Sequence, residues 1–282
     1  MEDRFIDVSG VRVRYRDSGG PGLPIVLTHG IGGSLELWTP QLSDLGQSHR
    51  IIAWDAPNHG LSDLTGKVED WESYAGWLLA FADSLGLDQF IAGGNSMGGA
   101  LSLRVAGLAP DRVKGVVLAN AASFGREVFP VFRLMTLPVL GGVLTKPSEK
   151  GVDLALSAMV RDQACVTPDM RAAMRRNQFK EGGAAAFLAT LRTGSTVFGQ
   201  RASTWTTSHG LLSTLDMPML ILHGRQDAVL PLKHSEHAAK LAKSAHLIVM
   251  EDCGHTPQIE KPAEFNTALS AFARMLFAVK AA

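Results

Sequence analysis

The segment from Phe90 to Ala106 limits the possible folds of this chain more than any other part of the sequence. An apolar run at 90–92 leads into the pentapeptide Gly-Asn-Ser-Met-Gly at 94–98, and a helix-like run follows it. Glycine two residues before and two residues after Ser96 permits a sharp turn. The pattern predicts a strand, a tight turn and a helix, with the Ser96 hydroxyl held at the apex as a nucleophile. A serine in an ordinary loop is the alternative, because the chain has 29 glycines in 282 residues.

Two polar side chains later in the chain supply the partners that a serine nucleophile needs. A serine hydroxyl is a poor nucleophile at neutral pH, so it needs an imidazole to accept its proton and a carboxylate to orient that imidazole. Asp227 follows an apolar strand-like run at 218–224, and His255 follows another at 246–250. We therefore predict Ser96 as the nucleophile, Asp227 as the acid and His255 as the base. Asp252 is the second candidate for the acid.

This order of residues resembles the α/β-hydrolase superfamily, in which serine, acid and histidine occur in that order on loops at strand ends. The resemblance extends over essentially the whole chain. It includes His29-Gly30 after a strand at 24–28, and the segment 55–62, where Asp55 resembles a structural turn residue of the family. It also includes the run Gly-His-Thr-Pro at 254–257, with Glu260 and Pro262. Together these signatures are far more specific than the pentapeptide alone.

The resemblance also implies which groups would stabilise a developing oxyanion. In this superfamily the donors are the backbone amides of the residue after the nucleophile and of the loop after the early His-Gly. Carried onto this sequence, these are the amides of Met97 and Ile31. Gly32 and Gly33 would let a substrate approach the backbone, and His29 is expected to shape this loop rather than to transfer protons.

Neither a nucleotide nor a metal site is expected. The glycine cluster at 30–33 lacks the third glycine of a dinucleotide-binding loop, because Leu35 stands in its place. His234 and His237 lie three residues apart on a charged helix-like stretch, where a solvated face is a better interpretation than metal ligation. The sequence therefore implies no cofactor and no metal.

Composition and charge exclude some classes of partner. The 27 basic and 27 acidic residues give a formal net charge of zero, whereas proteins that bind nucleic acid usually carry a basic excess. No apolar run approaches the length of a membrane span, and Met1–Arg4 has no secretory signal pattern. We expect a cytoplasmic protein with a small-molecule substrate, without nucleic-acid or membrane partners, and with Cys165 and Cys253 as free thiols. The sequence carries no indication of the oligomeric state.

The order of elements predicts an α/β fold with a mostly parallel central sheet flanked by helices. Short apolar strands alternate with helical runs up to about Ala122, beginning with an antiparallel hairpin at 5–8 and 11–16. A helix is expected at 71–85, from apolar residues at helical spacing. We predict a hydrolase core at 1–122 and 213–282 and a helical cap at 123–212. The cap is expected to contain no strand.

The cap is expected to close over the serine and to supply the pocket in which the substrate is selected. Residues 123–212 contain eleven basic and six acidic side chains, a balance that would attract an anionic substrate. A solvated helical face explains the same count. The large aromatic residues of this segment are candidates for the pocket and equally for the interior of the cap: Phe129, Phe132, Phe187, Phe198 and Trp205.

Hydrolysis of a carboxylic ester or lactone through an acyl-enzyme on Ser96 is the leading hypothesis for the function. Haloalkane dehalogenases and epoxide hydrolases place aspartate at the nucleophile position, so Ser96 argues against both. A small-molecule receptor of the same fold is a further alternative, because an intact set of catalytic residues does not exclude one.

Carbon–carbon bond hydrolysis is the main alternative reaction. The capped layout and the run Gly-Asn-Ser-Met-Gly-Gly at 94–99 resemble the meta-cleavage product hydrolases, which act on vinylogous diketo acids. Two departures count against this interpretation. Those enzymes carry Gly-Pro-Gly where this chain has Ile-Gly-Gly at 31–33, and a tryptophan where this chain has Thr256. Arg175 and Arg176 are the candidates for their cap arginine.

Overall fold

Eight strands form one central sheet in the computed structural model, which describes residues 1–281. Their order across the sheet is β1-β2-β4-β3-β5-β6-β9-β10. β1 pairs antiparallel with β2, β2 pairs antiparallel with β4, and the other neighbours run parallel. The predicted mostly parallel sheet is therefore confirmed. The strands are β1 (Arg4–Val8), β2 (Val11–Asp17), β3 (Ile25–Thr28), β4 (Ile51–Trp54), β5 (Phe90–Asn95), β6 (Val113–Ala119), β9 (Met219–Gly224) and β10 (Ala245–Met250).

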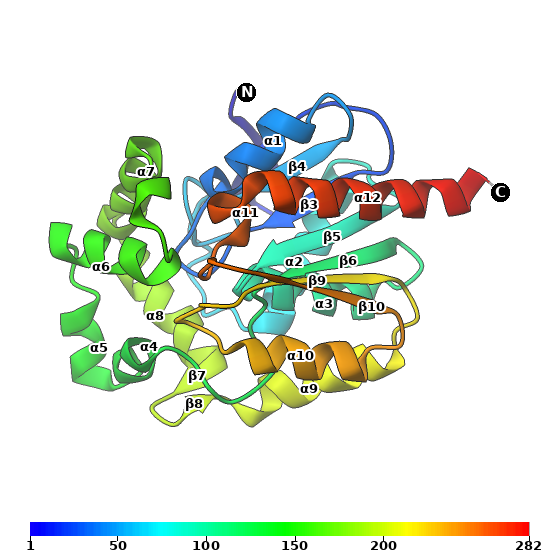
Figure 1. The fold of residues 1–282 in the computed structure, drawn as a ribbon. Helices are drawn as coiled ribbons and strands as arrows, with labels where there is room; N and C mark the ends of the chain where they lie inside the picture. The colour runs from blue at the N-terminus through cyan, green and yellow to red at the C-terminus, as the bar shows by residue number, and fades with distance from the viewer. Residues whose placement is uncertain (282) are drawn as a thin grey trace.

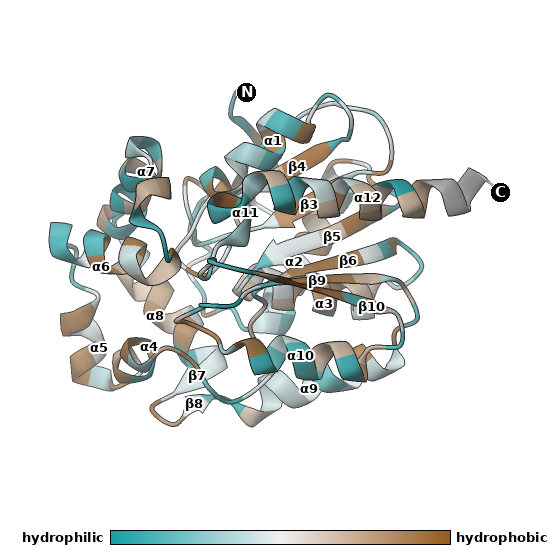
Figure 2. Cartoon of the chain, viewed as in Figure 1, coloured by the Kyte–Doolittle hydropathy of each residue, from teal (hydrophilic) through white to brown (hydrophobic). Residues whose placement is uncertain are grey.

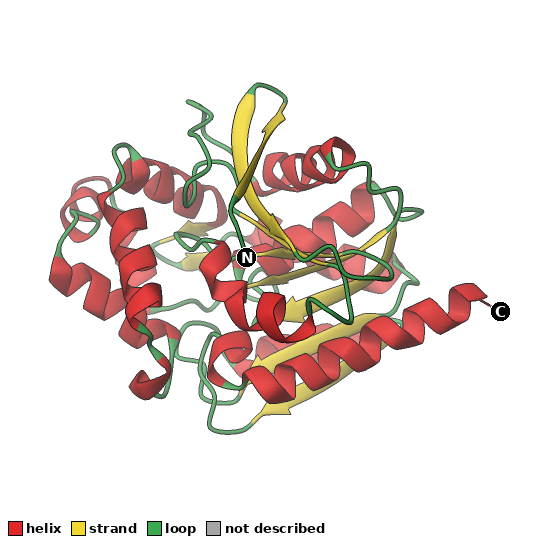
Figure 3. Cartoon of the chain, turned by 90° about the horizontal axis from the view of Figure 1, so that it is seen from above, coloured by secondary structure: helices red, strands yellow, loops and turns green. Residues whose placement is uncertain are grey.

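The predicted hairpin at the start of the chain is present. Ser9 and Gly10 join β1 to β2, and both have positive φ angles of 50° and 84°. Two consecutive residues in the left-handed region are what a two-residue hairpin turn needs to match the twist of its strands. Figure 3 shows this hairpin twisting away from the rest of the sheet.

Helices cover both faces of the sheet (Figure 1). The strands in the middle of the sheet are buried on both faces, so their side chains divide between two apolar clusters. In β3, Ile25 and Leu27 pack in one cluster and Val26 packs in the other. The first cluster includes residues of α1 (Thr39–Leu45) and α12 (Pro262–Ala281). The second includes residues of α2 (Trp71–Ser84), α3 (Met97–Leu108), α9 (Ala202–Thr214) and α10 (Leu232–Leu241).

The predicted helix at 71–85 corresponds to α2. It begins at Trp71 because Asp70 caps it, its carboxylate accepting from the Ser73 amide at 2.8 Å. It ends at Ser84, and Gly86 with a φ of 65° turns the chain towards β5. In Figure 2 the hydrophobic colours gather on the strands between the helix layers.

The insertion, residues 123–212 between β6 and β9, is mostly helical, but the prediction that it has no strand is wrong. Ser195–Thr196 (β7) and Gly199–Gln200 (β8) pair antiparallel. Each strand is only two residues long, too short for an alternating pattern to appear in the sequence. The helices of the insertion before these strands are α4 (Pro130–Met135), α5 (Pro138–Leu144), α6 (Glu149–Met159), η2 (Gln163–Cys165), α7 (Pro168–Phe179) and α8 (Gly183–Gly194).

The last helix of the insertion, α9, lies beside the central sheet rather than with α4–α8. It packs against α3 and α10, as the lower part of Figure 1 shows. Helices α4–α8 lie together at the left of Figure 1, at the carboxyl ends of the parallel strands. The division of the chain into core and cap at residue 212 stays a prediction. Among residues 1–281, no helix combines the length and the apolar character that crossing a bilayer requires.

Candidate active site

Ser96 is the single residue between β5 and α3. Its φ of 55° and ψ of −117° are angles that residues with a side chain rarely adopt. The tight turn depends on the two flanking glycines. A Cβ atom on Gly94 would lie 2.2 Å from the carbonyl carbon of Gly98, and one on Gly98 would lie 2.1 Å from the backbone oxygen of Thr28. The predicted sequence of strand, turn and helix is therefore present.

Backbone hydrogen bonds hold the Ser96 turn while its hydroxyl takes no part in them. The Ser96 amide donates to the Ala119 carbonyl at 3.0 Å, and its carbonyl accepts from the Ala122 amide at 2.9 Å. The hydroxyl does not cap α3, although Ser96 occupies the N-cap position. The side chain instead lies in the wall of a cavity, with only 7% of the residue exposed. A small molecule in this cavity would meet the hydroxyl directly.

Asp227 and His255 face each other at the ends of β9 and β10. Nδ1 of His255 lies 2.8 Å from Oδ2 of Asp227. The same oxygen accepts from Nδ2 of Asn120 at 2.6 Å, and Oδ1 accepts from the amides of Val229 and Leu230 at 2.7 and 3.1 Å. A carboxylate only accepts hydrogen bonds, so Nδ1 of His255 carries a proton. Nε2 of His255 is then free to accept one, and His255 lines the same cavity as Ser96.

The electrostatic surroundings of Asp227 keep it ionised. Burial on its own would raise the pKa of Asp227, but the attraction of His255 and the hydrogen bonds from His255 and Asn120 outweigh burial. The pKa therefore lies below the ordinary value of 3.8. Asp252 lies at the surface instead, where its side chain is 72% exposed and pairs with Arg161 at 3.3 Å. This geometry favours Asp227 over Asp252 as the partner of His255.

Two residues that the sequence analysis missed complete the surroundings of Asp227. Asn120 directly follows β6, and its amide oxygen accepts from the Gly224 amide at 3.2 Å. His223 lies in β9, with Nε2 3.1 Å from the Leu230 carbonyl and 3.5 Å from Asp227. The carbonyl requires Nε2 to donate, and burial lowers the pKa of His223 to about 4, so the ring is neutral. Asn120 follows an apolar strand and His223 lies within one, and neither belongs to a sequence motif by which it could have been found.

Glu260 holds the loop that carries His255. Its Oε1 accepts from the backbone amides of Gly254 and Thr256 at 2.9 and 3.3 Å, on either side of the histidine. Its Oε2 accepts from the Arg161 amide at 2.7 Å, just beyond the end of α6. One carboxylate therefore fixes the histidine loop and joins it to the insertion.

We expect Glu260→Gln to lower kcat/KM about 10-fold for any substrate that reacts at this site, and the free energy of unfolding by about 1–3 kcal/mol, because hydrogen bonds to a charged acceptor are lost. Glu264→Gln is the matched control, since Glu264 is exposed on the neighbouring helix α12. Steady-state kinetics and urea unfolding of both variants measure the two effects. Equal behaviour of the two variants would contradict the role of Glu260 in positioning the loop.

A tight turn follows β3, where the sequence analysis places the Ile31 amide. The Gly33 amide donates to the Gly30 carbonyl at 3.0 Å and closes a turn around Ile31. The side chain of the neighbouring His29 stabilises this turn. Its Nδ1 lies 2.7 Å from the Gly30 carbonyl, and its Nε2 accepts from the Ala56 amide at 3.1 Å. Burial lowers the pKa of His29 to about 4, so it is a neutral structural group at physiological pH.

This loop lies directly against the nucleophile turn. A Cβ atom on Gly30 would lie 3.2 Å from Cβ of Ser96. The amides of Ile31 and Met97 donate no hydrogen bond to another residue within 1–281. Two unengaged amides beside the serine could both donate to an oxyanion, which is the arrangement expected of an oxyanion hole.

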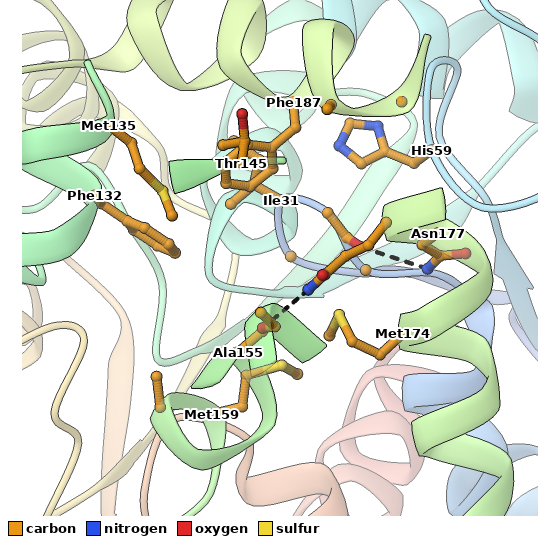
Figure 4. Close-up of a pocket in the computed structure, with 18 of the residues that line it drawn as sticks. Ile31, His59, Phe132, Met135, Thr145, Ala155, Met159, Met174, Asn177 and Phe187 are labelled. Carbon is orange, nitrogen blue, oxygen red and sulfur yellow. Dashed lines mark hydrogen bonds between the residues drawn. The ribbon is translucent and has the colours of Figure 1, made fainter. Parts of the chain in front are cut away.

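A cavity of about 170 Å³ lies beside Ser96, between the sheet and the insertion. Figure 4 shows residues of α4, α6, α7 and α8 around it, together with Ile31 from residues 29–33, the loop after β3 that we call the oxyanion loop after its predicted role. Most of its lining is apolar: Ile31, Leu37, Phe129, Val131, Phe132, Met135, Leu144, Leu154, Met159, Met174, Phe187 and Val229. Of the aromatic pocket candidates, Phe198 is 71% exposed outside the cavity and Trp205 lies on α9.

Neither candidate for a cap arginine reaches the cavity. Arg176 lies 3.0 Å from Glu36 and 3.2 Å from the Ser34 hydroxyl, so it ties α7 to the segment after the oxyanion loop. Arg175 pairs with Glu149 at 2.6 Å. The cations in the described lining are Lys146 and Lys180. A substrate carboxylate would therefore meet lysine rather than arginine in this cavity.

Comparisons with known proteins show to which family the chain is similar. Residues 25–268 match the sequence model of a family described as the alpha/beta hydrolase family. A dihydrolipoyllysine-residue acetyltransferase component of the acetoin cleaving system of Pseudomonas putida is 31% identical, over 95% of this chain and 68% of that protein. The 2-hydroxymuconate semialdehyde hydrolase of Pseudomonas sp. strain CF600 is 27% identical, over 95% of this chain and 93% of that protein. A solved structure of the meta-cleavage product hydrolase of Pseudomonas fluorescens IP01 has a TM-score of 0.82 at 25% identity, covering 96% of this chain and 97% of that chain.

Proposed function

Because the chain belongs to the alpha/beta hydrolase family, we propose that it is a serine hydrolase that cleaves a carboxylic ester or lactone of a small molecule. The observation that carries this proposal is the 2.8 Å contact between Asp227 and His255, with His255 and Ser96 in the wall of one apolar cavity. Acyl transfer needs a nucleophile and a base that border the same binding space, with the base oriented by an acid, and these two observations support that reading.

The proposed reaction has two steps. Nε2 of His255 takes the proton of the Ser96 hydroxyl as its oxygen attacks the substrate carbonyl, and the amides of Ile31 and Met97 donate to the resulting oxyanion. His255 then gives the proton to the leaving alcohol, and an ester on Ser96 remains. In the second step water, deprotonated by His255, attacks this ester and releases the acid and the free serine. Asp227 holds the His255 ring and stabilises its charged form throughout.

Oxyanion donation is expected to contribute substantially to the rate. Removing a single donor from such a site typically costs about 10²–10³-fold in kcat, because the donors are fixed before the charge develops. In this chain both donors are backbone amides on rigid turns, one closed by the Gly33 amide and the other beginning α3. Their positions are therefore set by the fold rather than by flexible side chains.

Hydrolysis of a carbon–carbon bond is the second candidate function. The similarity to two hydrolases that carry such activities in their names, over nearly the full length of each chain, favours it. The cavity lining favours ester hydrolysis, because Arg175 and Arg176 pair with residues outside the cavity. A comparison of turnover for an ester and for a diketo acid distinguishes the two reactions.

We expect the protein to hydrolyse p-nitrophenyl esters with an optimum at short acyl chains, since a cavity of about 170 Å³ holds a small molecule. The test compares kcat/KM for the acetate, butyrate, octanoate and dodecanoate esters with that for 2-hydroxy-6-oxo-2,4-heptadienoate. Butyrate is expected to exceed dodecanoate by about 10-fold or more, because each excess methylene must leave the apolar pocket. Faster loss of the diketo acid would establish the carbon–carbon hydrolase instead. No turnover of either, with no labelling of Ser96 by a fluorophosphonate, would favour a receptor.

A further inference from the structure

His59 lies in the wall of the cavity although the proposed reaction gives it no task. It belongs to the loop after β4 and is only 4% exposed. Figure 4 shows its ring near Ile31, Phe187 and Asn177, on the side of the cavity that the oxyanion loop forms. A histidine at this place can contact a molecule that fills the cavity beside Ser96.

The two ring nitrogens of His59 have different roles. Nδ1 lies 3.0 Å from the Pro57 carbonyl, which can only accept, so Nδ1 carries the proton. In the neutral ring Nε2 is then a bare acceptor. Nε2 is buried and has no hydrogen-bond partner among residues 1–281. No other described residue of the cavity lining has a buried side-chain nitrogen or oxygen in this state. Buried polar atoms are nearly always paired, so an unpaired one beside a binding cavity needs an explanation.

Polar neighbours of His59 are already engaged with other groups. The Asn58 amide donates to the Tyr74 hydroxyl at 3.2 Å. The ammonium of Lys180 donates to the carbonyls of Gly60 and Ser62. Neither side chain donates to Nε2, which leaves the cavity as the source of a donor.

We propose that Nε2 of His59 accepts a hydrogen bond from a hydroxyl group of the substrate, so that the natural substrate is a hydroxylated ester or lactone. This inference rests on the proposed function, because it concerns the substrate of the same site. The proposed hydroxyl group of the substrate would lie at the side of the cavity that the oxyanion loop forms.

The charges around His59 select a neutral donor over the alternatives. Burial lowers the pKa of His59 to about 3, with a further contribution from His29 and from Lys180, so the ring is neutral at physiological pH. A carboxylate has no proton to donate to Nε2. A cationic donor would be repelled by the ammonium of Lys180. A hydroxyl donates to Nε2 without charge, and its oxygen can accept from another donor.

We expect the wild-type protein to prefer the hydroxylated member of an isosteric ester pair by about 10- to 100-fold in kcat/KM. One pair places the hydroxyl on the acyl side: p-nitrophenyl 3-hydroxybutyrate and p-nitrophenyl 3-methylbutyrate. A second pair places it on the alcohol side: 2-hydroxyethyl butyrate and propyl butyrate. In His59→Phe the ratio is expected to fall to about one, because the acceptor is lost while the ring shape is kept. His59→Gln retains an acceptor oxygen and is expected to restore part of the preference.

His246→Phe is the control, because His246 is exposed on β10 and should leave the ratio unchanged. A wild-type ratio near one for both pairs would overturn the inference, and so would a preference that survives in His59→Phe. An equal fall for both members of a pair would show that His59 only supports the fold.

Binding to Ser96→Ala separates this inference from the proposed function. Calorimetry with the same pairs measures the preference without turnover, so it is informative even if no ester is hydrolysed. Tighter binding of a hydroxylated member, lost in Ser96→Ala/His59→Phe, would support the inference. Equal binding of both members in both pairs would contradict it, whatever reaction the protein performs.

Discussion

Ser96→Ala is expected to lower kcat/KM for the best ester on the order of 10⁶-fold, because no other group can form the acyl-enzyme. His255→Ala should cost about as much, since nucleophile and base act as one unit. The fold should persist, because the Ser96 hydroxyl caps no helix and the turn is held by backbone contacts to Ala119 and Ala122. Steady-state kinetics measure the loss of activity, and circular dichroism measures the retention of the fold. Fluorophosphonate labelling followed by peptide mass mapping identifies the serine that reacts.

A serine on α3, the helix that follows Ser96, provides the control. Ser102 is fully buried in α3, and its hydroxyl donates to the Gly98 carbonyl at 2.8 Å. Ser102→Ala removes a hydroxyl from the adjoining helix without touching the cavity, so it should keep activity within about 10-fold of wild type. Retention of more than about 1% of the activity by Ser96→Ala, or labelling that persists in it, would contradict a nucleophilic role for Ser96.

The sheet and the nucleophile turn were predictable because both depend on local patterns. Apolar runs of four to seven residues mark the buried strands, and glycine at 94 and 98 marks a turn that leaves no room for a Cβ atom. The two-residue strands β7 and β8 lack such a pattern, so the sequence analysis missed them. Pairing of so few residues depends on the surrounding insertion and has no local signal.

Contacts between distant segments explain what the sequence could not reveal about the candidate site. The contact between Asp227 and His255 was expected from the order of motifs, whereas the bond from Asn120 to Asp227 joins residues 107 positions apart. His59 lies in a segment that was interpreted only as a family signature. Its unpaired nitrogen is visible only when every neighbour is in place. The sequence could not tell which of the aromatic candidates line the pocket. The structure places Phe198 at the surface and Phe187 beside Gly32.

The insertion is attached to the candidate site at two separated points, and this explains how the cavity keeps its shape. Arg176 of α7 bonds to Glu36 and Ser34 beside the oxyanion loop. The carbonyl of Met159, at the end of α6, accepts from the His255 amide at 3.0 Å. Both loops of the candidate site therefore contact the segment that also supplies the apolar wall. Substitutions in this wall that alter which substrate binds can therefore also disturb the contacts that hold the proposed base and oxyanion donors.

Asp227→Asn is expected to lower kcat/KM on the order of 10⁴-fold, because an amide facing Nδ1 of His255 favours the wrong tautomer of the ring. The substitution preserves shape, and the side-chain oxygen can still accept from the Val229 and Leu230 amides, so the fold should remain. Asp252→Asn is the matched control and should change activity less than about 2-fold, because its exposed carboxylate pairs with Arg161 at the surface. Kinetics of the two variants on the same ester decide the assignment. If Asp252→Asn carried the large loss and Asp227→Asn did not, the acid of this site would be Asp252, and the contact at 2.8 Å would only position the ring.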